Sequence, residues 1–188
     1  MFGIETDDGS VITPSEYFKT NYIVALDLPC AFAYFFFMYE VMLMACYLFA
    51  NDKLTLRRFS WTFLVTNLLG VTTFYFYPAA PPWYAIEYGM GPAKLDIPPN
   101  PARLSAVDTY LGINYFEAIY SHSTNLFTSI PSLQAAYPLI VWFTAFKVFP
   151  RYHLFFFALA LLTGFAAVYL CHHYVIDVLL GFIYASIA

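Results

Sequence analysis

The run from Phe59 to Pro78 contains no charged side chain, and it is one of several mostly apolar runs in this chain. A helix that crosses the hydrocarbon core of a bilayer needs about 20 mostly apolar residues. Further runs lie at residues 21–50, 131–149 and 152–188. The last is long enough for two spans with a break near Cys171. The pattern predicts an all-α polytopic transmembrane helix bundle of about five to six spans, forming one integral membrane domain over residues 1–188.

The overall composition excludes several classes of protein. The chain is 61% hydrophobic and 11% charged, whereas a soluble domain carries about 25% charged residues. A chain so poor in charge cannot cover a soluble globule with polar side chains, and its hydrophobicity excludes disorder. Only 8 Lys and Arg and a net charge of -4 speak against a nucleic-acid partner. The class of protein that remains after these exclusions is a membrane protein surrounded by lipids.

Basic residues in the links between runs predict how the bundle is oriented. Lys53, Arg57 and Arg58 follow the first run, while Lys147 and Arg151 follow the third. Short links rich in Lys and Arg stay on the cytoplasmic side. The opposite side then carries most of the acids: Glu5, Asp7, Asp8, Glu16, Glu87, Asp96, Asp108 and Glu117. We therefore expect the segment 79–130 to be lumenal or extracellular.

This outer segment, residues 79–130, holds the densest cluster of prolines. Seven of the 12 prolines lie between Pro78 and Pro101, which favours extended or turning backbone over a regular helix. The residues from Ser105 to Tyr120 are expected to form one short amphipathic helix, with Ser105 or Asp108 near its start. Such a helix either caps a site at the membrane surface or only fills a gap between helices.

The strongest chemical signal opens the last apolar run. Residues 172–177 read His-His-Tyr-Val-Ile-Asp, so that His173 and Asp177 share one face of a helix. A carboxylate there can fix the tautomer of the imidazole and leave the other nitrogen free as a nucleophile or base. Ionisable pairs in membrane helices are costly and usually functional. The alternative is a structural hydrogen bond at a helix start.

A second signal lies at residues 129–134, which read Ser-Ile-Pro-Ser-Leu-Gln. Pro131 suits the first turn of a helix, and the N–H groups of Ser132, Leu133 and Gln134 are then free to bind an anion. A lone Pro-Ser helix start is common, but both motifs are predicted on the outer side. Together they predict a phosphate site at the membrane surface.

These motifs resemble those of the membrane phosphatidic-acid-phosphatase type 2 (PAP2) superfamily, most closely its inositol phosphorylceramide synthase branch. The resemblance covers residues 27–181 and depends on three motifs in order. They are Ala-Pro-Pro-Trp-Tyr at residues 80–84, Pro-Ser-Leu-Gln at 131–134 and the His-His motif at 172–177.

The resemblance implies a mechanism without a metal or another cofactor. His173 would attack phosphorus and form a phosphohistidine, with Asp177 orienting it. A second His, the fourth residue of a Pro-Ser-Leu-His motif, would protonate the departing lipid alcohol. The implied donor is a phosphatidylinositol-like phospholipid and the implied acceptor is a ceramide-like alcohol. In the phosphatases of the superfamily, the acceptor is water.

Position 134 departs from that pattern because it holds Gln. Glutamine hydrogen-bonds but exchanges no proton near neutral pH, and general acid–base catalysis is worth about 10²–10⁴-fold. Three hypotheses follow: a transferase, either active or inactivated by Gln134, a lipid phosphate phosphatase, or an inactive lipid-binding membrane protein. His122 in the outer segment is a substitute acid to consider.

Further residues are candidates for substrate binding. Alanines at positions 166 and 167 stand where the phosphatases carry an Arg, so Arg103 and then Lys94 are the candidate phosphate ligands. A lipid-headgroup-facing role is the alternative for Arg103. Asp27 is a candidate for a polyol headgroup, or for structural pairing. The remaining candidates are Trp83, Tyr84, Ser132 and His172.

Overall fold

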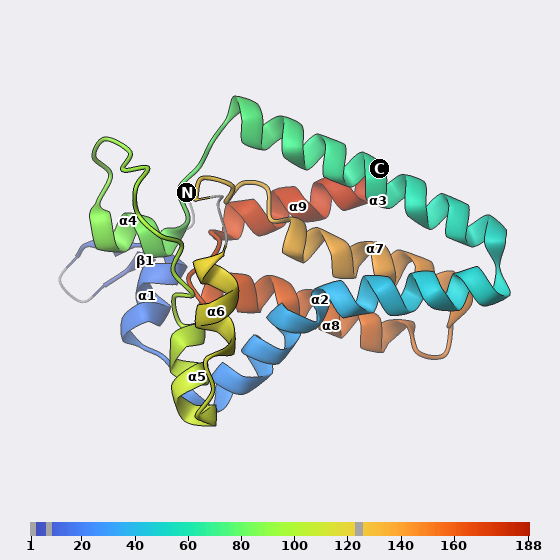
Figure 1. The fold of residues 1–188 in the computed structure, drawn as a ribbon, viewed down its shortest axis with the longest axis horizontal. Helices are drawn as coiled ribbons and strands as arrows, with labels where there is room; N and C mark the ends of the chain where they lie inside the picture. The colour runs from blue at the N-terminus through green and yellow to red at the C-terminus, as the bar shows by residue number, and fades with distance from the viewer. Residues whose placement is uncertain (1–2, 7–8, 123–125) are drawn as a thin grey trace.

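The computed structural model describes residues 3–6, 9–122 and 126–188, so the outer acids Asp7 and Asp8 lie outside the described residues. Long helices form a bundle: α2 (Val24–Asn51), α3 (Lys53–Phe76), α7 (Leu133–Val148), α8 (His153–Tyr169) and α9 (Val175–Ile187). Smaller elements gather at one end of it (Figure 1): β1 (Ile4–Glu5), β2 (Val11–Ile12), α1 (Pro14–Thr20), α4 (Pro82–Tyr88), α5 (Leu104–Leu111) and α6 (Tyr115–Ser121). The all-α class is confirmed, with one small antiparallel hairpin added.

Helix α7 occupies the centre of the bundle and contacts α2, α3, α8 and α9. Its first turn lies directly against α9, where a Cβ added to Gly181 would stand 2.2 Å from the carbonyl oxygen of Ser132. The backbone N–H of Ser132 also donates to the carbonyl of Asp177 over 2.9 Å. Glycine at 181 therefore allows the two motif-bearing helices to start side by side.

The chain reverses direction at each link between long helices (Figure 1). The link after α2 and the link after α7, which carry the basic residues, lie at the end of the bundle away from the small elements. The starts of α7 and α9 lie at the same end as the small elements. This arrangement places the two sequence motifs together.

Among the described helices, α2 alone is both long and apolar enough to cross a membrane, with a mean hydropathy of 1.7. Helices α7, α8 and α9 are apolar but have 16, 17 and 13 residues. Large apolar side chains nevertheless face outward along several helices, including Phe32, Leu43, Phe49, Leu68, Val71, Phe76, Phe146, Phe155 and Ile183.

The outer segment differs from the sequence-based expectation in two places. Residues 82–88 form α4 despite the prolines, because Pro82 occupies the first helical position, where no backbone N–H is needed. The single helix expected over 105–120 is two helices, because Gly112 adopts a φ of 65° and ends α5. Asp108 then accepts from the N–H groups of Tyr115, Phe116 and Glu117 and starts α6, rather than starting α5.

The N-terminal helix α1 was not predicted, although its start has a clear sequence signal. Thr13 and Glu16 form a capping box in which each side chain accepts from the other residue's backbone N–H. Ser15, fully buried, donates its hydroxyl to the carbonyl of His173 over 3.1 Å. The thiol of Cys171 donates to the carbonyl of Ser15 over 3.3 Å. Helix α1 thus supports the turn that carries the histidines.

Candidate active site

The two adjacent histidines lie in the turn between α8 and α9. The carbonyl of Ala167 accepts from the backbone N–H groups of both His172 and His173, each over 3.0 Å. Cys171 takes the left-handed conformation, with a φ of 64°, and reverses the chain there. The turn therefore fixes the backbone from which both imidazoles project.

His173 is held by a backbone carbonyl, with the carboxylate further away. Its Nδ1 lies 2.7 Å from the carbonyl oxygen of Ser129 and 3.7 Å from Oδ2 of Asp177. A carbonyl can only accept, so the Nδ1 atom carries a hydrogen and donates it. The expected direct bond from Asp177 is thus replaced by Ser129, and Nε2 of His173 is directed toward the cavity.

Asp177 is instead fixed by neighbours of His173. Its Oδ2 accepts from the hydroxyl of Ser129 over 2.5 Å and from the backbone N–H of Tyr174 over 2.8 Å. Both His173 and Asp177 are buried. The carboxylate lies close enough to stabilise positive charge on the imidazole, while its hydrogen bonds keep the Ser129 segment in place.

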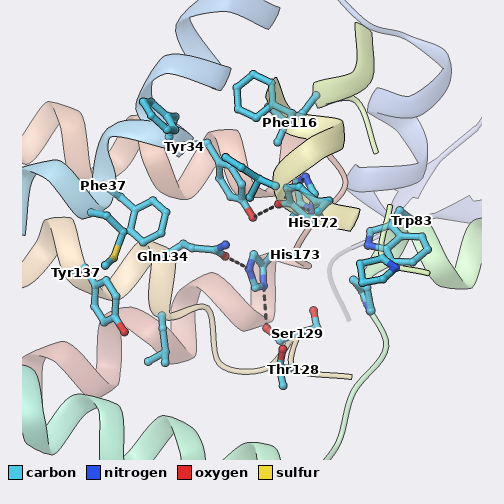
Figure 2. Close-up of a pocket in the computed structure, with 18 of the residues that line it drawn as sticks. Tyr34, Phe37, Trp83, Phe116, Thr128, Ser129, Gln134, Tyr137, His172 and His173 are labelled. Atoms are coloured by element: carbon cyan, nitrogen blue, oxygen red, sulfur yellow. Dashed lines mark hydrogen bonds between the residues drawn. The ribbon is translucent and has the colours of Figure 1, made fainter. Parts of the chain in front are cut away.

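Gln134, in the first turn of α7, directly contacts the free nitrogen of His173. Its side-chain amide contacts Nε2 of His173 (Figure 2). The residue at the position of the expected second catalytic histidine therefore meets the predicted nucleophile across 39 residues of sequence. The structure brings these two residues together, as expected if both served one site.

Both residues line a cavity of about 850 Å³. Its walls come from helices α2 to α7, the segment 126–131 before α7 and the turn at 172–173, and most of the lining side chains are aromatic or aliphatic. Among the lining residues that the structure describes, none is Lys or Arg. The cavity is suited to a ligand with an apolar body and a polar group near His173.

His172 lines the same cavity but is enclosed by aromatic rings. Its imidazole stacks on Tyr34 at 4.9 Å and on Tyr120 at 5.1 Å between ring centroids. Burial, with a smaller effect of His173, lowers the pKa of His172 to about 3. Burial raises the pKa of Tyr120 to about 12. His172 is therefore neutral and connects α6 to α2 at the cavity wall.

The candidate charged ligands lie outside the cavity. Arg103 donates from Nε and Nη2 to the two carboxylate oxygens of Asp27, each over 2.7 Å, and stacks on Tyr22 at 3.8 Å. Tyr169 also donates its hydroxyl to Asp27, which is fully buried. Lys94 is exposed and lies over the ring of Tyr88 at 5.4 Å. The expected phosphate and polyol ligands Arg103 and Asp27 neutralise each other instead.

Of the other candidate residues, Trp83 lines the cavity, whereas Tyr84 and Ser132 support the surrounding backbone. Trp83 lines the cavity and donates its backbone N–H to the carbonyl of Cys171 over 3.1 Å. Tyr84 is buried behind it and accepts from the backbone N–H of Lys94. Ser132 caps α7 by accepting from the N–H of Ala135, and its own N–H is occupied by Asp177. Ser132 thus contributes no free N–H for an anion.

Sequence reasoning did not assign Ser129, Tyr34 and Tyr120 to the site. Ser129 stood inside a quoted motif, but a role for its backbone carbonyl has no side-chain signal. Tyr34 and Tyr120 come from separate segments with many other aromatic residues. His122 is exposed, hydrogen-bonded to the carbonyl of Ala118 and outside the cavity lining. In the described part of the chain, no three His, Cys, Asp or Glu side chains cluster in a way that fits a metal ion.

Comparison with known proteins finds relatives that are named as synthases of phosphoinositol dihydroceramide or inositol phosphorylceramide. A phosphoinositol dihydroceramide synthase of Bacteroides thetaiotaomicron is 36% identical over 96% of this chain and 60% of its own length. An inositol phosphorylceramide synthase catalytic subunit of Schizosaccharomyces pombe is 33% identical over 71% of this chain and 32% of its own. The inositol phosphorylceramide synthase catalytic subunit of Saccharomyces cerevisiae is 35% identical over 61% of this chain and 29% of its own length. The chain thus spans less than two thirds of each of these relatives.

No solved structure gives a significant match. A model of the PAP2 superfamily, however, matches residues 16–188, which include most of α1, the outer segment and both motif-bearing helix starts. The resemblance read from the three motifs is therefore confirmed at the level of the family, and this chain belongs to the PAP2 superfamily.

Proposed function

We propose that this chain is a membrane transferase that moves a phospho-headgroup, inositol phosphate, from a glycerophospholipid to a ceramide-like alcohol. The observation that carries the proposal is the contact between Nε2 of His173 and Gln134 at the wall of an apolar cavity. The names of the relatives, which are synthases of phosphoinositol dihydroceramide or inositol phosphorylceramide, support this choice of substrates.

The proposal includes a multi-pass topology. Residues 1–188 form one integral membrane domain in which α2, α3, α7, α8 and α9 span the bilayer, with residues 79–130 as an outer cap. The outward-facing apolar side chains of α2, α3 and α7 support a lipid surrounding. Basic residues in the links after α2 and α7 support a cytoplasmic location for that end, and hence a lumenal or extracellular site.

The chemistry assigned to His173 is nucleophilic. Its Nε2 attacks the phosphorus of the donor while Nδ1–H remains on the carbonyl of Ser129. The P–O bond to diacylglycerol breaks, and a phosphohistidine carrying the headgroup forms. Asp177, at 3.7 Å, stabilises the positive charge on the imidazole. The hydroxyl of the ceramide-like acceptor then attacks phosphorus, and the P–N bond breaks.

A second candidate function follows from the same contact. Gln134 occupies the Nε2 atom that must attack, and it has no proton to exchange. A lipid-binding protein that keeps the cavity without turnover is consistent with that arrangement. Substrate has to displace Gln134 from Nε2 before the transfer reaction begins.

The experiment compares the purified chain in detergent with two variants, Gln134→His and His173→Ala. Each receives phosphatidylinositol and ceramide, and both the lipid product and free phosphate are followed; phosphatidic acid is the donor in a parallel assay. We expect inositol phosphorylceramide from the chain and from Gln134→His, and none from His173→Ala.

The remaining outcomes separate the alternatives. Free phosphate from phosphatidic acid without a lipid product would favour a phosphatase. If both the unmodified chain and Gln134→His bind lipid but neither turns it over, the lipid-binding protein would be favoured. Full activity of His173→Ala would exclude the phosphohistidine route. Ser121→Ala, at an exposed position in α6, serves as the matched control for handling and folding.

A further inference from the structure

Tyr34 stands beside the position where the expected acid is missing. It belongs to α2, is 3% exposed and lines the cavity together with His173 and Gln134. Its ring is parallel to the imidazole of His172, with an interplanar angle of 12°. Figure 2 shows the Tyr34 hydroxyl directed toward the side of the cavity where Gln134 lies. The ring therefore has little freedom to turn.

The hydroxyl of Tyr34 lies in the wall of the same cavity as His173 and Gln134. It accepts a hydrogen bond from the Tyr120 hydroxyl over 3.5 Å, a bond that does not use the hydrogen of Tyr34 itself. Gln134 contacts Nε2 of His173. A group that holds an acidic proton therefore shares the cavity with the atom that attacks phosphorus.

We propose that Tyr34 is the general acid and base of this site, in place of the histidine that the family pattern would put at position 134. The inference rests on the proposed headgroup transfer and adds the residue that exchanges protons with the lipid alcohols. A phenol is a much stronger acid than an aliphatic alcohol and remains protonated at neutral pH. It can therefore protonate a departing alkoxide.

In the first half-reaction, Nε2 of His173 attacks the phosphodiester and the P–O bond to diacylglycerol breaks. The Tyr34 hydroxyl gives its proton to the departing oxygen, which leaves as neutral diacylglycerol. The tyrosinate that remains keeps the hydrogen bond from the Tyr120 hydroxyl, which is stronger to a charged oxygen.

In the second half-reaction, the acceptor alcohol gives its proton to the Tyr34 oxygen as its own oxygen attacks phosphorus. The P–N bond breaks, and the electron pair returns to Nε2 of His173. Tyr34 is again a neutral phenol, and the product is a phosphodiester of the acceptor. Protons, charges and bonds balance over the cycle without another reactant.

Other protic groups of the cavity are committed elsewhere. Tyr137 donates its hydroxyl to Oδ1 of Asn67 over 2.6 Å, and Ser129 donates to Asp177 over 2.5 Å. His172 is stacked between two rings and stays neutral. Tyr34 lines the same cavity, and its hydroxyl accepts from Tyr120 without using its own hydrogen.

The test replaces the hydroxyl and keeps the ring, with Tyr34→Phe assayed for transfer from phosphatidylinositol to ceramide. We expect a loss of about 10²-fold or more in kcat, the usual size of an acid–base contribution. Adding Gln134→His to Tyr34→Phe restores activity, because a histidine again supplies the proton. Tyr184→Phe, which removes a hydroxyl bonded to Thr73 away from the cavity, is the matched control and retains activity.

A second substrate shows whether the Tyr34 hydroxyl acts as a general acid or has only a structural role. An aryl phosphodiester of the same headgroup with a nitrophenolate leaving group needs no proton, so Tyr34→Phe should cleave it within a few-fold of the unmodified chain. An equal loss on both substrates would overturn the proposal and indicate a structural role.

The outcomes also distinguish this proposal from the proposed function. If the unmodified chain is active and Tyr34→Phe loses less than about 10-fold, Tyr34 is excluded and the transfer reaction stands. If only Gln134→His is active, Tyr34 is excluded as the native acid while the site remains a transferase site. If neither form transfers a headgroup, the proposed function itself is overturned.

Discussion

Arg103 and Asp27, 76 residues apart in sequence, form a two-pronged ion pair between the start of α5 and the first turn of α2. The side chain of Arg103 is 12% exposed and that of Asp27 is fully buried. We expect Arg103→Gln to lower stability by about 3 kcal/mol, because Asp27 is left as a buried carboxylate without its cation. Thermal unfolding in detergent without lipid measures this loss.

The same variant separates a structural pair from a phosphate ligand. If Arg103 bound phosphate directly, Arg103→Gln would raise KM for the phospholipid and leave the melting temperature unchanged. Lys94→Gln is the matched control, since Lys94 is exposed, and it should change neither quantity.

Ser129 holds the catalytic turn by both its backbone and its hydroxyl. Ser129→Ala keeps the carbonyl that accepts from His173 and removes the hydroxyl that donates to Asp177. A hydrogen bond to a charged group contributes about 1.5–3 kcal/mol, so we expect a loss of stability of that size. Calorimetric or fluorescence melting checks it, and the exposed residue Ser121 provides the comparison as Ser121→Ala. Equal melting temperatures for the two variants would contradict the assigned bond.

Gly181 is required by the close approach of α9 to α7. A Cβ at this position would lie 2.2 Å from the backbone carbonyl oxygen of Ser132, which cannot turn away as a side chain can. We expect Gly181→Ala to destabilise the protein by about 3 kcal/mol, as overpacking does. Gly91→Ala, which meets no atom within 4 Å, should have little effect. The melting temperatures of the two variants are measured side by side, and equal values would contradict the close approach at Gly181.

His172 should make the protein sensitive to acid. Its pKa is about 3 in the folded state against an ordinary value of 6.5, because burial disfavours the charged form. The unfolded chain therefore binds a proton that the folded protein does not, and stability falls as the pH drops from about 6.5 toward 3. Melting temperatures between about pH 7 and pH 4.5 measure this slope.

The matched variants for that slope are His172→Phe and His122→Gln. Phe keeps the stack between Tyr34 and Tyr120 but does not titrate, so its melting temperature should fall less with acid than that of the unmodified chain. His122 is exposed, and His122→Gln should keep the full slope. A slope unchanged by His172→Phe would show that His172 does not cause it.

Much of the helical framework was predictable from the sequence. Apolar runs located the long helices, and the break near Cys171 was correctly placed, because a bundle of apolar helices is specified by local composition and length. The outer segment was predicted less well. The division of residues 104–121 into two helices depends on Gly112 and on a carboxylate of Asp108 that reaches the next helix start.

The sequence by itself determined the family and its three motifs, since their residue types and spacing are local properties of the chain. The tertiary structure decided which residues meet. It placed Ser129 rather than Asp177 against Nδ1 of His173, paired Arg103 with Asp27 away from the cavity, and put Tyr34 and Gln134 in the wall of one cavity. These contacts join residues 44 and 76 positions apart in two of the cases. Helix packing, which no periodicity in the sequence encodes, sets such distances.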